Sequence, residues 1–225
     1  MVSLTIGMFL LLGLFGIWYQ THQTFSAQDQ LAHLQDNERM ALTIMANIVQ
    51  TAGYYPNYLN YSGSPPSTPY TQTTVFLPTA PFVAAGQFVA GTYSATAPGD
   101  TLTLRFMADA STLDCLGQTD VTATVVTNQF TVDNNGNLQC AVNGGAPQTI
   151  VTGVSNISIL YGVDTVGDGS AHEYMNASTV TANTDWSSVR SVAIQLTFNN
   201  PLSGQPGQPT LPAITRTIAV TQGFV

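Results

Sequence analysis

The first 19 residues of this chain contain no charged side chain, and the first carboxylate is Asp29. Met1 to Tyr19 has the composition of a helix that is apolar on every face, and at about 1.5 Å per residue it spans close to the thickness of a bilayer hydrocarbon core. Trp18 and Tyr19 close the run, as aromatic pairs do at a membrane–water interface. We therefore predict a membrane-spanning helix over residues 1–19. A cleaved signal peptide fits less well, because the charged leading segment is missing.

From residue 20 to residue 53 the pattern becomes two-sided. Apolar residues recur at a spacing of three to four, with Glu38 as the single exception, and polar residues such as Asp36 and Arg39 fall on the other side. No proline precedes Pro56, and Gly53 stands where a helix C-cap is expected. We predict one helix over 1–53, about 75 Å long; the alternative is a signal-anchor helix followed by a separate linker helix. The residues predicted to pack on a sheet are Leu31, Leu34, Ala41, Met45, Ile48 and Ala52.

Residues 54–225 are predicted to form one globular, β-rich domain. Alternation of apolar and polar residues is clearest over 101–107, where Leu102, Leu104 and Phe106 share one face and Arg105 lies on the other. Proline-rich segments without periodicity predict irregular loops over 54–99 and 199–212. The fold class is therefore α+β, a long helix packed on a mostly antiparallel sheet. The predicted strands are 101–107, 122–127, 129–132, 138–142, 150–163 (one strand or a pair), 189–198 and 214–220.

The charge of the chain excludes two classes of partner. It has four arginines, no lysine and a net charge of −8. Nucleic-acid binding needs clustered basic residues that replace phosphate counterions, and adhesion to anionic lipid headgroups needs them too. We expect neither.

The two cysteines, Cys115 and Cys140, are expected to form a disulfide. A single pair that follows an export-type segment is typical of an oxidising compartment. The alternatives are two buried free thiols or half of a metal site. The three histidines are scattered along the chain, so a zinc site has too few neighbouring ligands.

The segment Asp164-Thr-Val-Gly-Asp-Gly-Ser is similar to a calcium-binding loop, which places carboxylates at alternate positions around a glycine turn. Asp164 and Asp168 occupy ligand positions, but Val166 and Met175 stand where two further ligands are needed. We expect a polar turn between strands and no cofactor. The alternative is a degraded calcium loop with Asp164 and Asp168 as metal ligands.

No catalytic motif is apparent in the chain. His172 and the many serines and aspartates lack the strand–Gly-x-Ser-x-Gly–helix context of a hydrolase. Asn143-Gly144-Gly145 lacks the lysine of a phosphate-binding loop. A glycosidase-like pair of carboxylates is the enzymatic alternative that the sequence leaves open. We expect a protein that is not an enzyme.

Four short segments carry a resemblance to a known family. Met-Val-Ser-Leu-Thr-Ile-Gly at 1–7 resembles the stretch that follows the cleavage site of type IV pilins. The segments 34–39 (Leu-Gln-Asp-Asn-Glu-Arg), 51–55 (Thr-Ala-Gly-Tyr-Tyr) and 161–165 (Tyr-Gly-Val-Asp-Thr) resemble PilW-like minor pilins in particular. Such chains often carry Asp at the position of Val166. The resemblance implies that a leader, its cleavage glycine, a methylated first residue and the glutamate of the type IV pilin motif precede Met1.

This resemblance implies a structural and assembly role. The expected function is that of a minor pilin, which primes or enters a type IV pilus together with other pilins, an inner-membrane assembly platform and a prepilin peptidase. The subunit is expected in the inner membrane, with its domain in the periplasm, and then in the extracellular filament. Two alternatives are a minor pseudopilin of type II secretion, similar to the J subunit, and a membrane-anchored surface binding domain. The residues expected in the membrane or filament core are Ile6, Phe9, Leu10, Leu12, Leu14, Phe15 and Trp18.

Overall fold

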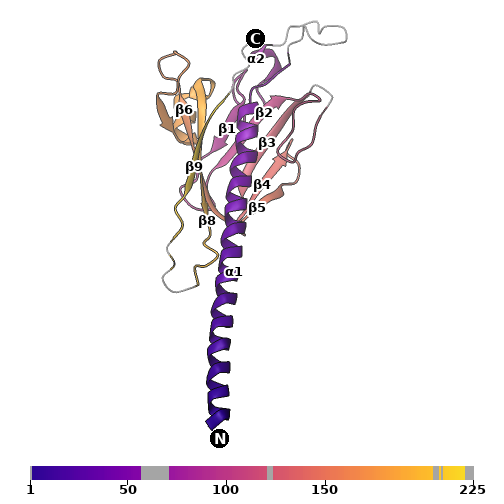
Figure 1. Cartoon of the computed structure of the whole chain (residues 1–225). Coiled ribbons are helices and arrows are strands. Elements are labelled where there is room, and N and C mark those ends of the chain that lie inside the picture. The colour runs from indigo at the N-terminus through magenta and orange to yellow at the C-terminus, as the bar shows by residue number, and fades with distance from the viewer. Residues whose placement is uncertain (1, 57–70, 121–123, 205–207, 209, 221–225) are drawn as a thin grey trace.

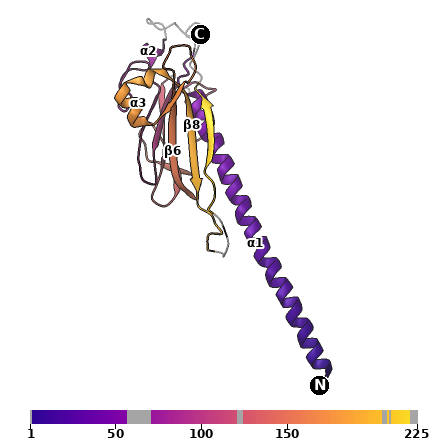
Figure 2. The same cartoon turned by 90° about the vertical axis from the view of Figure 1, so that its left-hand side faces the viewer.

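The computed structural model of the chain describes residues 2–56, 71–120, 124–204, 208 and 210–220, without the side chains of residues 2–5 and 9. It opens with one continuous helix of 50 residues, α1 (Val2–Thr51). The helix ends where the sequence predicts, because Gly53 follows with φ of +80° and donates its N–H to the carbonyl of Arg105. Figures 1 and 2 show that the first half of α1 extends away from the rest of the molecule.

The first sheet has five antiparallel strands in the order β1-β2-β3-β4-β5. Its register places Leu102 opposite Phe130 on the buried face and Arg105 opposite Thr127 on the other face. The strands are β1 (Val89–Thr92), β2 (Thr101–Met107), β3 (Val125–Val132), β4 (Asn137–Val142) and β5 (Gln148–Thr152).

The second sheet has four antiparallel strands in the order β7-β6-β8-β9, and short helices flank the two sheets. Its central strands are long, and Tyr161 on one of them packs edge-on against Trp186 with ring centroids 4.8 Å apart. The strands are β6 (Val154–Val163), β7 (Glu173–Met175), β8 (Val189–Phe198) and β9 (Ile214–Ala219), and the short helices are α2 (Gln72–Val75), α3 (Ala177–Asn183) and the 3₁₀ turn η2 (Asp185–Ser188).

One hydrophobic core joins both sheets and the second half of α1. The helix contacts β5 at the edge of the first sheet and β9 at the edge of the second, so it lies across both, as Figure 1 shows. Met45 and Ile48 on the helix, Leu104 on β2 and Ile194 on β8 are all buried in this core. Each such side chain contributes about 1.5–3 kcal/mol when it leaves water, so the helix is an integral part of the domain.

The predicted class, α+β with a long helix on antiparallel strands, is confirmed, but the strands differ in detail. They form two sheets where the sequence analysis expects one, and β3 is a single strand where two are predicted. The described part of the predicted loop 54–99 contains α2 and β1. β1 lacks alternation because Gly91 is required within it: a Cβ there would collide with the hydroxyl of Tyr161 and the carbonyl of Thr101.

Candidate functional site

The first half of α1 exposes a continuous apolar surface to solvent. Its large side chains are each between 54% and 69% exposed. A soluble domain rarely leaves so many apolar side chains uncovered on one element, and such a surface marks a contact with another molecule or with lipid. If another molecule covered them, the gain would be on the order of 10 kcal/mol. The exposed residues are Ile6, Met8, Leu10, Leu11, Leu12, Leu14, Phe15, Ile17, Trp18, Tyr19 and Phe25.

Six of the seven residues predicted for a membrane or filament core belong to this surface; Phe9, the seventh, has its side chain outside the described residues. The rings of Phe15, Trp18 and His22 lie in a row along one side, with successive ring centroids 5.9 and 5.7 Å apart. At Gly13 and Gly16 a Cβ would meet no other atom within 4 Å. These two bare positions leave the helix surface flat, so that a second helix can approach closely.

The predicted membrane-spanning helix over residues 1–19 is not confirmed. Among the described residues, none of the helices combines the length and the apolar character that crossing a membrane requires.

The second half of α1 carries the residues predicted to pack on a sheet. Leu34 is 9% exposed, four others are almost completely buried, and Leu31 is half-buried against the core. Glu38, the polar exception on this face, is half-buried, and burial raises the pKa of its carboxyl above the ordinary value. Asn37 also fixes the helix to the first sheet by donating to the carbonyl of Thr152 at 3.3 Å. The four almost completely buried residues are Ala41, Met45, Ile48 and Ala52.

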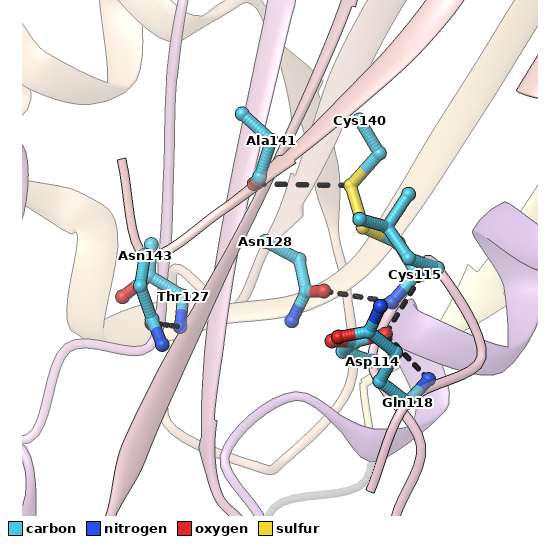
Figure 3. The surroundings of a disulfide bond; sticks show 9 residues. Asp114, Cys115, Gln118, Thr127, Asn128, Cys140, Ala141 and Asn143 are labelled. Carbon is cyan, nitrogen blue, oxygen red and sulfur yellow. Dashed lines mark hydrogen bonds between the residues drawn. A yellow bond between two sulfur atoms is a disulfide. The ribbon is translucent and has the colours of Figure 1, made fainter. Parts of the chain in front are cut away.

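Cys115 and Cys140 are joined by a disulfide, with their Cα atoms 6.4 Å apart (Figure 3). The disulfide bond joins the loop that precedes strand β3 to strand β4. Asn128 on β3 holds the same loop by accepting the backbone N–H of Cys115 at 2.8 Å, and Asp114 closes its turn by accepting the N–H groups of Leu116 and Gln118. The disulfide and these polar contacts therefore hold this loop in place beside α1.

A groove of about 780 Å³ runs between α1, this disulfide-bonded loop and β5. Met40 and Leu113 lie on its rim and are about half exposed, whereas Ile48 lies at its base. The groove begins beyond the exposed apolar surface of α1, on the part of the helix that packs on the domain.

The carboxylate of Asp164 organises the turn that follows β6. It accepts the backbone N–H of Gly167 at 2.6 Å and of Gly169 at 2.8 Å, and Arg190 on β8 donates its Nε at 3.4 Å. Burial alone would raise the pKa of this carboxyl, but the N–H donors of Gly169, Gly167, Arg190 and Val166 outweigh it and lower the pKa to about 2. The turn is therefore a hydrogen-bonded anion nest built around one side chain.

Asp168 and His172 approach Asp164 from the same turn. His172 places Nε2 3.3 Å from Asp168 and Nδ1 3.9 Å from Asp164. Within the part of the chain that the structure describes, these three residues are the only set of three potential metal ligands that converge. Because the oxygens of Asp164 already accept several N–H groups, few of its lone pairs remain for a cation. The geometry favours the polar turn over the degraded calcium loop.

Arg105 is buried, which the sequence analysis does not predict. Alternation places it on the polar face of β2 beside Thr103, yet both residues are buried, because residues 72–88 cover this face. Phe82 lies under the guanidinium, with 4.1 Å between Cζ and the ring centroid. The three phenylalanines of the covering segment, Phe76, Phe82 and Phe88, were the available sign that it packs on the sheet.

Two comparisons with known proteins find chains that are similar to this one. Residues 119–220 match the family described as Type IV Pilus-assembly protein W. No curated protein matches the chain. Among solved structures, a type IV-like pilin from Thermus thermophilus is similar, with 15% identity and a TM-score of 0.44, over 83% of this chain and 96% of that one. The matched segment includes residues 161–165, one of the four segments that carry the resemblance noted in the sequence, so the chain is PilW-like over residues 119–220.

Proposed function

We propose that this chain is a minor pilin, a structural subunit that primes or enters a type IV pilus. The observation that carries the proposal is the exposed apolar half of α1, which projects from a domain whose core is complete without it. In a filament, neighbouring helices would cover this surface, and the bare positions at Gly13 and Gly16 would admit them closely.

The partners follow from the same surface and from the family. The contacts proposed here are helix-to-helix contacts with other pilins. An assembly platform and a prepilin peptidase at the inner membrane would act on the subunit before it enters the filament, with its domain in the periplasm. The match to a pilus-assembly family and the apolar helix support contacts with other pilus components.

The test is a charge placed inside the apolar surface. Gly13→Arg leaves the subunit itself undisturbed, because no atom lies within 4 Å of the new Cβ. A charged side chain at the centre of an apolar helix costs about 2.5–3.5 kcal/mol when that helix is buried. This cost corresponds to a decrease on the order of a hundredfold in the amount of subunit in the filament. We expect Gly13→Arg to disappear from sheared filaments while the domain unfolds at the same urea concentration as the wild type.

Gln28→Arg is the matched control, since it adds the same charge to an exposed position of α1 beyond Phe25, the last residue of the apolar surface. It should remain in sheared filaments at the wild-type amount, measured by immunoblot and normalised to whole cells. Normal incorporation of Gly13→Arg would contradict the proposal. Absence of the wild-type protein from filaments would also contradict it, and would favour a surface binding domain.

A further inference from the structure

Arg105 is a buried cation with unused hydrogen-bonding capacity. Its side chain is 3% exposed. Nε donates to the carbonyl of Gln87 and Nη1 to the carbonyl of Leu77, both at 2.7 Å. Nη2 is buried and has no hydrogen-bond partner within the described part of the chain. A guanidinium has five N–H donors, so most of its donors here are unpaired.

Within the described residues, no carboxylate forms an ion pair with this guanidinium. Over the described residues, none of the ion pairs involves Arg105, whereas Arg190 lies 3.4 Å from Asp164. The segments outside the described residues contain no aspartate or glutamate. Burial without a counter-charge lowers the pKa of the guanidinium to about 10. Such a cation is costly unless an anion or other acceptors complete its surroundings.

Arg105 is one of the residues that line a cavity of about 310 Å³ on the outer face of the first sheet. Its walls are mostly apolar: Val75 and Phe82 come from the covering segment and Val125 from β3. Thr127, which stands opposite Arg105 in the β2–β3 register, adds a hydroxyl group. Concave, mostly apolar sites with one charged group are typical of small-molecule sites, and this volume is at the small end of their range.

We propose that this cavity binds a small organic carboxylate with an apolar body. The carboxylate accepts the unpaired N–H groups of Arg105, and the apolar body lies against Phe82, Val75 and Val125. A single guanidinium with no second cation nearby matches one negative charge, and its planar fork suits a carboxylate. The site is separate from the apolar surface of α1, so it does not depend on the proposed role as a pilin.

The experiment titrates phenylacetate into the full chain in a non-ionic detergent and measures heat by calorimetry. Phenylacetamide, which has the same shape and no charge, is the matched ligand. We expect one saturable site for phenylacetate and at least about tenfold weaker binding of the amide, because the charge-assisted hydrogen bonds are lost. Equal binding of the two ligands, or no heat with phenylacetate up to about 10 mM, would overturn the proposal.

Two variants locate the site. Val125→Phe fills the cavity and leaves Arg105 in place, so phenylacetate binding should weaken at least about tenfold. Arg216→Gln removes an exposed cation on β9 and should leave binding within about twofold of the wild type. This pair is preferred to a substitution of Arg105 itself, which would release the carbonyls of Gln87 and Leu77. Unchanged binding in Val125→Phe, or a loss in Arg216→Gln, would place any bound ligand elsewhere and refute the inference.

Discussion

Met45→Ala tests whether α1 is part of the domain core. Met45 is fully buried and packs in the cluster that joins both sheets. Truncation to alanine removes its buried methylene, sulfur and methyl groups and leaves a cavity that a well-packed core fills incompletely. Substitutions of this kind cost 2–5 kcal/mol, and complete burial at a junction of three elements places the expected loss at about 3 kcal/mol.

Met40→Ala is the matched control, because Met40 lies on the same helix and is 50% exposed. It should cost less than about 1 kcal/mol, since alanine is also the better helix former. The assay is urea unfolding in a non-ionic detergent, followed by the fluorescence of Trp186, which is buried against Tyr161. The background variant Trp18→Phe removes the other tryptophan. Equal midpoints for the two alanine variants would refute a core that includes α1.

Two further predictions concern the disulfide and the Asp164 turn. Replacing both Cys115 and Cys140 by alanine should lower the free energy of unfolding by about 3 kcal/mol, because the disulfide closes a loop with a sequence separation of 25. An unchanged midpoint of urea unfolding would contradict this prediction. The pKa of the Asp164 carboxyl is lowered to about 2 in the folded chain. The ionised carboxylate therefore stabilises the fold fully at a pH above its ordinary pKa of about 4, and this stabilisation is lost as the pH falls from about 4 to 2. The free energy of unfolding of Asp164→Asn should therefore fall less than that of the wild type between about pH 4 and pH 2. If the free energies of unfolding of the two proteins fall in parallel with pH, the Asp164 carboxylate does not stabilise the turn.

The long helix and most strands could be predicted because their signals are local. The period of α1 and the absence of proline before Pro56 define one helix, and Gly53 marks its end. Strict alternation predicts β2 in the same way. The division into two sheets depends on Gly153, whose φ of +86° separates β5 from β6 and directs them to different sheets. A strand or a strand pair is equally consistent with the local pattern there, because strand partners are chosen by the whole fold.

The burial of Arg105 could not be predicted for a related reason. Alternation assigns its side chain to one face of β2, but whether that face meets water depends on a segment up to 33 residues away along the chain, from Gln72 onward. That segment shows no hydrophobic period. Two of its backbone carbonyls and the ring of Phe82 contact Arg105, and Phe76 and Phe88 pack in the core. Such contacts leave no hydrophobic period in the sequence, so the three phenylalanines of the segment are the local sign that it covers the sheet.

The two halves of α1 therefore have different roles: the second half packs in the core of the domain, and the first half is exposed. Leu31 is the first described apolar residue of the helix that packs on the core, and the described side chains before it contribute none to the core. Position 13 and position 45 are about 48 Å apart along the helix, and they share no neighbour in the domain. Because the free energies of distant, unconnected sites add, a change at Met45 should act on the stability of the domain and a change at Gly13 on what the helix contacts outside it. The apolar residues of the first half are thus not explained by folding, and an external contact is the remaining physical reason for a chain to keep them exposed.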